Sequence, residues 1–203
     1  MNLRDGSTVS LGWILSYMRW GAVGAGLLFI AGSDFAQNHS DSCEAQMPRS
    51  LVNTLERTFP GFRVPLEYDN APEDIAYNKS HGGTGCLGVG TADFTGEGKK
   101  DYVIGMTAVN GGGGLAVIAL PKKGGWQLRS IQSWREHQRA SGYVAVVPPG
   151  KYDKTKSGAA QSGRDARESL TCSNPGIQIG TIEATGTVYC FVQGKLLHML
   201  VSD

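Results

Sequence analysis

Glycine is concentrated in one stretch of this 203-residue chain. Fourteen of its 29 glycines fall in the 44 residues from Gly82 to Gly125, and they follow no Gly-X-Y period, which excludes a collagen helix. The segments between them are short and rich in apolar and β-branched residues. Because glycine supplies the backbone freedom that tight turns need, this pattern predicts a meander of short antiparallel strands.

Four strands are expected in this stretch. They span residues 87–94, 102–109, 115–120 and 126–131. The third, Leu-Ala-Val-Ile-Ala-Leu, is apolar on both faces and is therefore expected at the centre of a sheet. The four glycines at 111–114 and the turn residues at 122–125 would connect neighbouring strands as hairpins.

One principal helix is predicted before this meander. Leu51, Leu55 and Phe59 recur every four residues within Pro48–Phe59, a spacing that places them on one helical face. A short strand is expected at 63–68, and Asn70 is expected to cap a single helical turn.

Further strands are predicted after the meander, at residues 143–147, 176–183, 187–193 and 195–201. The polar segment 151–169 has no apolar period and is interpreted as a mobile surface loop. The predicted fold class is α+β: a mainly antiparallel β meander or sandwich with one principal N-terminal helix. Residues 47–203 are expected to form a single domain.

The N-terminal 33 residues have the order of a signal peptide. Arg19 precedes the uncharged apolar run Gly21–Ala31, and small residues follow it. The predicted location is therefore exported, periplasmic or extracellular, with a flexible lead-in at residues 34–46. The alternative is a membrane anchor over residues 11–32, although Arg19 would then lie near the middle of the bilayer.

All four cysteines, Cys43, Cys86, Cys172 and Cys190, follow that segment. An even number of cysteines in an exported chain indicates disulfides. Three connectivities are possible, and we favour Cys43–Cys86 with Cys172–Cys190 because each joins the nearest partners. Zinc is disfavoured, because the chain has no CxxC motif and its four histidines are scattered.

The stretch Asp93–Asp101 is the one with identifiable chemistry. Oxygen-bearing side chains stand at its first, third, fifth and ninth positions, and the carbonyl of Lys99 could face inward at the seventh. Such alternation suits Ca²⁺, which takes about six to eight oxygen ligands. The predicted metal ligands are Asp93, Thr95, Glu97, Lys99 and Asp101. The alternative is a metal-free turn in which the carboxylates accept backbone N–H bonds.

This stretch resembles the FG-GAP/VCBS repeat, the calcium loop of integrin-type propeller blades. Asp93 and Asp101 match its first and ninth positions, whereas Thr95 and Glu97 depart from the aspartate or asparagine at its third and fifth. The motif occurs once, so a propeller of several blades is excluded. The chain is also similar to small secreted bacterial proteins of unknown function that carry one such loop, a resemblance that implies a fold and no activity.

The remaining signals narrow the function classes. A net charge of +1, with 18% charged residues, disfavours a nucleic-acid-binding face. We expect an exported, non-enzymatic, calcium-binding domain with a protein-binding or cell-envelope role. It would contact a membrane only if its N-terminal segment remained uncleaved. One alternative is a periplasmic immunity or enzyme-inhibitor protein using the basic segment Lys151–Arg167. Another is a metal-dependent hydrolase in which Asp93 and Asp101 hold the metal.

Overall fold

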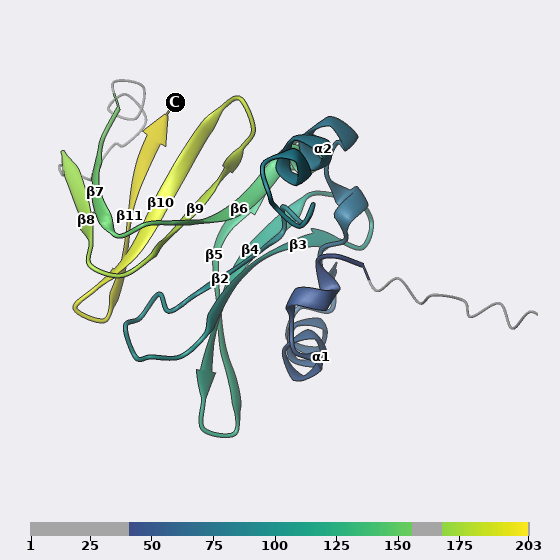
Figure 1. Cartoon of the computed structure of the whole chain (residues 1–203). Helices are drawn as coiled ribbons and strands as arrows, with labels where there is room; N and C mark the ends of the chain where they lie inside the picture. The colour runs from purple at the N-terminus through teal and green to yellow at the C-terminus, as the bar shows by residue number, and fades with distance from the viewer. Residues whose placement is uncertain (1–40, 156–167, 203) are drawn as a thin grey trace, which may run out of the picture. The chain divides into compact units, whose positions relative to one another are not determined.

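The computed structural model describes residues 41–155 and 168–202 (Figure 1). The predicted signal peptide, the alternative anchor and most of the expected loop 151–169 lie outside the described residues. The described residues fall in one compact unit. They form two short α-helices and antiparallel β-sheets, which confirms the predicted α+β class with mainly β structure.

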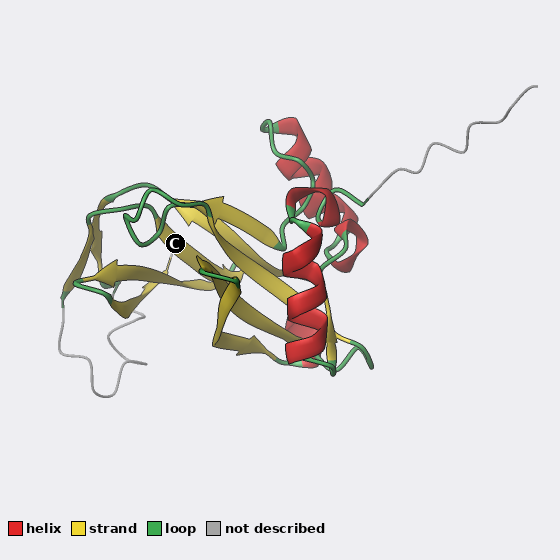
Figure 2. Ribbon diagram, turned by 90° about the horizontal axis from the view of Figure 1, so that it is seen from below, coloured by secondary structure: helices red, strands yellow, loops and turns green. Residues whose placement is uncertain are grey.

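The principal helix is α1 (Arg49–Thr58), as predicted from its four-residue apolar spacing. Its buried face consists of Leu51, Val52 and Leu55. A second helix, α2 (Pro72–Ser80), follows a 3-10 turn (Glu67–Asp69) and is longer than the single turn expected there. Figure 2 shows the helices gathered on one side of the strands.

The glycine-rich stretch forms the first sheet. Strands β2 (Val89–Ala92), β3 (Asp101–Ala108), β4 (Gly114–Lys122) and β5 (Gly125–Trp134) pair in order as an antiparallel meander. The two-residue strand β1 (Phe62–Arg63) pairs with the end of β3, on the same edge of β3 as β2 and opposite β4. The predicted meander is thus confirmed, with β3 and β4 both central.

The second sheet has the order β11-β10-β9-β6, and all its pairings are antiparallel. Its strands are β6 (Gly142–Val147), β9 (Gly176–Thr181), β10 (Thr185–Val192) and β11 (Lys195–Ser202). A small ribbon pairs β7 (Gly150–Asp153) with β8 (Ser169–Cys172). Both ends of the segment predicted as a mobile loop are therefore strand, because they pair with each other.

The first sheet is covered on both faces, and alternation along β3 shows how. Tyr102, Ile104 and Met106 belong to the same buried cluster as Leu51 and Leu55 of α1. Val103, one residue out of phase, belongs to a second cluster that also holds Val144, Ile177 and Ile179 of the second sheet. Because successive side chains point to opposite faces of a strand, the arrangement is three layers: helix, sheet, sheet.

Two disulfides join the chain in the favoured arrangement. Cys43–Cys86 ties the start of the domain to the segment before β2, and Cys172–Cys190 ties β8 to β10. The prediction of a flexible lead-in over residues 34–46 is partly wrong. Cys43 is buried, and a 3-10 turn follows at Glu44–Gln46. Disulfides of this kind indicate an oxidising, extracytoplasmic environment. Within the described ranges, no helix has the length and apolar character that crossing a bilayer requires.

Candidate functional site

The Asp93–Asp101 loop folds around the carboxylate of Asp93. Its Oδ1 accepts backbone N–H bonds from Gly96 at 2.7 Å and Glu97 at 3.0 Å, and its Oδ2 accepts one from Gly98 at 2.7 Å. Gly96 and Gly98 have φ values of 76° and 74°, a left-handed conformation that glycine adopts without steric cost. The sequence Asp-x-x-Gly-x-Gly thus builds a turn that presents amide groups to its own aspartate.

Asp101, at the start of β3, closes the loop from inside the molecule. It is 1% exposed, and its Oδ2 accepts bonds from the backbone N–H groups of Phe94 and Thr95 at 3.0 and 3.2 Å. Burial raises the pKa of Asp101, the bonds from Thr95 and Phe94 oppose that rise, and the nearby charge of Asp93 adds to it. Two carboxylates therefore share one small loop.

Three of the five predicted metal ligands converge in the structure. The Thr95 hydroxyl lies 3.4 Å from Asp93 Oδ1 and 3.2 Å from Asp101 Oδ2, so it links both carboxylates. Glu97 does not join them, because its carboxylate lies 3.4 Å from Lys99 Nζ and 3.6 Å from Lys122 Nζ. In residues 41–155 and 168–202, no group of three or more His, Cys, Asp or Glu is placed to hold a metal ion. The loop fits Ca²⁺ only in part, since an incoming ion would compete with N–H groups already bound to Asp93.

A small pocket of about 260 Å³ adjoins this loop. Thr95 and Glu97 line it, together with basic and apolar residues from the sheets, Ile118, Leu120, Lys122, Gln127, Arg129 and Phe191 among them. Neither Asp93 nor Asp101 is among its lining residues. A metal-dependent hydrolase would need a substrate pocket next to a metal held by Asp93 and Asp101. Because neither aspartate lines this pocket, it does not supply such a site.

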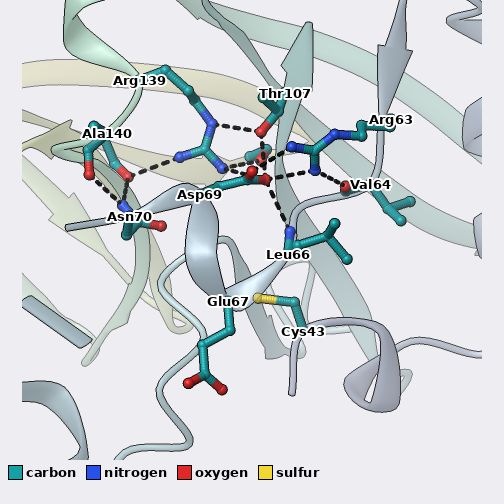
Figure 3. Close-up of polar contacts among 12 residues, drawn as sticks. Cys43, Arg63, Val64, Leu66, Glu67, Asp69, Asn70, Thr107, Arg139 and Ala140 are labelled. Atoms are coloured by element: carbon teal, nitrogen blue, oxygen red, sulfur yellow. Dashed lines mark hydrogen bonds and ion pairs between the residues drawn. The ribbon is translucent and has the colours of Figure 1, made fainter. Parts of the chain in front are cut away.

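A second constellation is a buried ionic network centred on Asp69 (Figure 3). Asp69 Oδ2 accepts bonds from Arg63 Nη1, Thr107 Oγ1 and the Leu66 backbone N–H at 2.8, 2.8 and 2.9 Å. Arg63 Nη2 also contacts Asp69 Oδ1. Burial acts to raise the pKa of Asp69, but the bonds from Arg63, Leu66 and Thr107 outweigh it and hold that pKa below its ordinary value.

Arg139 connects this network to β3 of the first sheet and to β6 of the second sheet, where its Nη1 donates to the Gly142 carbonyl at 3.4 Å. It is 5% exposed, and it donates from Nε to Thr107 Oγ1 at 2.9 Å and from Nη2 to the Gly105 carbonyl at 3.1 Å. Asn70, expected as a helix cap, donates instead to the carbonyls of Ala140 and Gly142 at 3.0 and 2.7 Å. Ala71 is the N-cap of α2. The cap expectation was wrong: α2 begins one residue later, and the Asn70 side chain bonds carbonyls that are distant in sequence.

A third site is a pocket of about 770 Å³ beside α2. α2 contributes Glu73, Asp74, Tyr77 and Asn78 to its lining, and the turn after the helix contributes His81, Gly82 and Gly83. Leu87, Tyr143 of β6, and Ile182 and Glu183 of the β9–β10 turn complete it. This volume lies in the range typical of ligand sites, about 300–1,000 Å³.

The electrostatics of this pocket are negative. The pKa of Asp74 is raised first by partial burial and then by the charges of Glu73 and Glu183. Glu183 lies on a different element, the β9–β10 turn, and lines the same pocket as Asp74. The sequence offered little sign of the pocket, because α2 has only weak amphipathic periodicity and its facing residues lie about 100 positions later in the chain.

No protein-family model, curated protein or solved structure matches this chain. The function must therefore be argued from the geometry of the domain.

Proposed function

We propose that this chain is an exported, disulfide-stabilised domain that acts by binding another protein, without catalytic activity of its own. The pocket beside α2 is its recognition site. The observation that carries the proposal is an open pocket of about 770 Å³ beside an aromatic side chain, Tyr77, that is 68% exposed.

Exposed aromatics matter because they supply large contact areas at low entropic cost, and they are enriched at protein interfaces. Tyr77 stacks on His81 with ring centroids 4.1 Å apart, which limits the freedom of its ring. Leu87 and Ile182 add apolar surface to the same pocket. The two disulfides support an extracytoplasmic setting, in which such a domain would meet its partner.

Site-specific photo-crosslinking tests this proposal. The full chain, expressed in its native host, would carry benzoylphenylalanine in place of Tyr77, which lines the pocket. The matched control carries the same residue in place of Tyr68, which is 72% exposed and does not line the pocket. Mass spectrometry of the crosslinked product would then identify the attached segment.

We expect a discrete crosslinked partner from position 77 and much less from position 68. Equal products at both positions, or none at either, would contradict the proposal. The crosslinked segment itself, rather than the mere capture of a protein, identifies the binding mode.

A further inference from the structure

We propose that the pocket beside α2 receives an arginine side chain presented by the partner protein. This inference rests on the proposed function, and it names the chemistry that the pocket selects. Two properties of the lining support it: charge and aromatic surface.

The pocket concentrates negative charge that is not neutralised from within. Glu73 and Asp74 come from the first turn of α2, and Glu183 comes from the β9–β10 turn. Among the described residues, none of these three carboxylates takes part in an ion pair, and neither lysine nor arginine lines the pocket. Lys79, also on α2, pairs with Glu67 at 2.5 Å. A cation in the pocket would relieve the mutual repulsion of the three carboxylates.

The backbone at Glu183 is also unusual. Its φ is 58°, one of two left-handed conformations at non-glycine positions in the described chain. Asparagine or glycine would adopt that conformation more readily than glutamate. The other such residue, Gln193, lies in the β10–β11 turn, so this conformation belongs to the hairpin turns of the second sheet, and a substitution at 183 must tolerate it.

The aromatic and apolar lining favours arginine over lysine or a simple metal cation. Tyr77, His81 and Tyr143 contribute aromatic surface to the lining, and Leu87 and Ile182 can contact an aliphatic stem. A guanidinium stacks on aromatic rings and binds carboxylates through two parallel bonds, whereas an ammonium is a compact and strongly hydrated charge. The volume exceeds that of one side chain, so flanking residues of the partner segment would also enter.

Peptide titration of the full mature chain, followed by ¹H–¹⁵N NMR, tests this inference. The probes are the tripeptide acetyl-Leu-Arg-Leu-amide and its citrulline analogue, which keeps the shape and removes the charge. The variants are E183N and E73Q/E183N, because asparagine tolerates the left-handed backbone at 183. The matched control is E56Q, since Glu56 is exposed on α1 and does not line the pocket.

We expect the arginine peptide to shift resonances of the pocket residues at lower concentration than the citrulline peptide. E183N should weaken arginine binding about two- to fivefold, the double variant should weaken it more, and E56Q should leave it unchanged. The arginine preference should also shrink as NaCl is raised, because salt screens exposed charges.

Equal binding of both peptides in the pocket would overturn the arginine inference while leaving the pocket a binding site. Binding of neither peptide would overturn the inference as well, and the crosslinking at position 77 would then decide the proposed function separately. A crosslinked segment without arginine would also overturn the arginine inference, and it would show that the pocket binds a partner through different chemistry.

Discussion

The Asp69 carboxylate shows how one residue can hold three parts of this domain together. It lies in the 3-10 turn before α2, pairs with Arg63 of β1 and accepts from Thr107 of β3, and Arg139 Nη2 lies 3.8 Å away. The side chains of Asp69 and Arg139 are both buried, and Asp69 pairs with Arg63 as well. Among the described residues, Arg139 has no acidic partner other than Asp69, so removing the Asp69 charge leaves a buried guanidinium without compensation.

We therefore expect Asp69→Asn to destabilise the domain by about 3–5 kcal/mol, the cost of breaking a buried ion pair. Asp153→Asn is the matched control, because Asp153 is exposed and its ion pair among the described residues is with exposed Lys151. Its effect should stay within about 0.5 kcal/mol. Urea denaturation measures both, and comparable losses for the two variants would contradict the role given to Asp69.

The same residue predicts a dependence on pH. Its folded pKa lies below its ordinary value, so its contribution to stability is complete above about pH 4 and is lost as the pH falls through the folded pKa. Asp69→Asn should therefore reduce the slope of unfolding free energy against pH on the acid side. An unchanged acid slope would show that other carboxylates dominate there.

Calcium binding at the Asp93–Asp101 loop stays a prediction. Because backbone N–H groups already occupy the Asp93 carboxylate, we expect weak binding, with a dissociation constant on the order of 1 mM. Calorimetry should then show Ca²⁺ uptake that Asp93→Asn removes and Glu97→Gln retains, since Glu97 pairs with lysines instead. Absence of heat with the unaltered chain, and a melting temperature unmoved by chelator, would leave the loop as a metal-free turn.

At the scale of elements, the hairpin between β3 and β4 depends on specific glycines. Gly113 has a φ of 119°, and a Cβ built on it would lie 2.2 Å from the carbonyl oxygen of Trp134. Its neighbour Gly112 would place a Cβ 2.9 Å from Asn110 Oδ1, the end of an exposed side chain that can move. Adjacent glycines in one turn therefore have different roles.

We expect Gly113→Ala to cost more than about 2 kcal/mol, because both backbone conformation and space are unfavourable. Gly112→Ala should cost less than about 1 kcal/mol, because only a side chain must adjust. Thermal unfolding of the two variants provides the comparison. Similar melting temperatures would mean that the turn relaxes more easily than its geometry implies.

At the scale of the whole molecule, the disulfides connect layers that hydrophobic contact alone would hold less firmly. Cys43–Cys86 joins the start of the domain, beside α1, to the approach to the first sheet, and Cys172–Cys190 joins the small ribbon to the second sheet. Their sequence separations are 43 and 18 residues, so the first closes the longer loop. In the chain-entropy account, longer loops gain more from closure.

Replacing each pair by serine should therefore cost about 2–4 kcal/mol, with the larger loss for Cys43→Ser/Cys86→Ser. Denaturation under non-reducing conditions measures both variants against the unaltered chain. A negligible loss for both would show that the three layers are stable without covalent links.

Local patterns allowed much of the fold to be predicted. The spacing of Leu51 and Leu55 located α1, and alternation between glycine turns and apolar runs located the strands of the meander, because both signals depend on near neighbours. Asn70 shows the limit of this reasoning: its residue type favours a helix cap, yet its side-chain amide donates to carbonyls about 70 residues away. The loop at Asp93–Asp101 was also found from spacing, since its interactions are local.

The order of residues along the chain was thus sufficient for the helix, the antiparallel meander and the Asp93–Asp101 turn, because each depends on short-range periodicity or turn chemistry. It favoured the disulfide pairs found, but choosing among three connectivities required the folded chain. The layering of two sheets, the Asp69–Arg139 network and the pocket beside α2 required the folded chain. In that pocket, Glu73 and Glu183 are more than 100 residues apart in sequence and meet only when β9 and β10 place their turn beside α2. No local signal encodes such a meeting, since it depends on how buried faces pack.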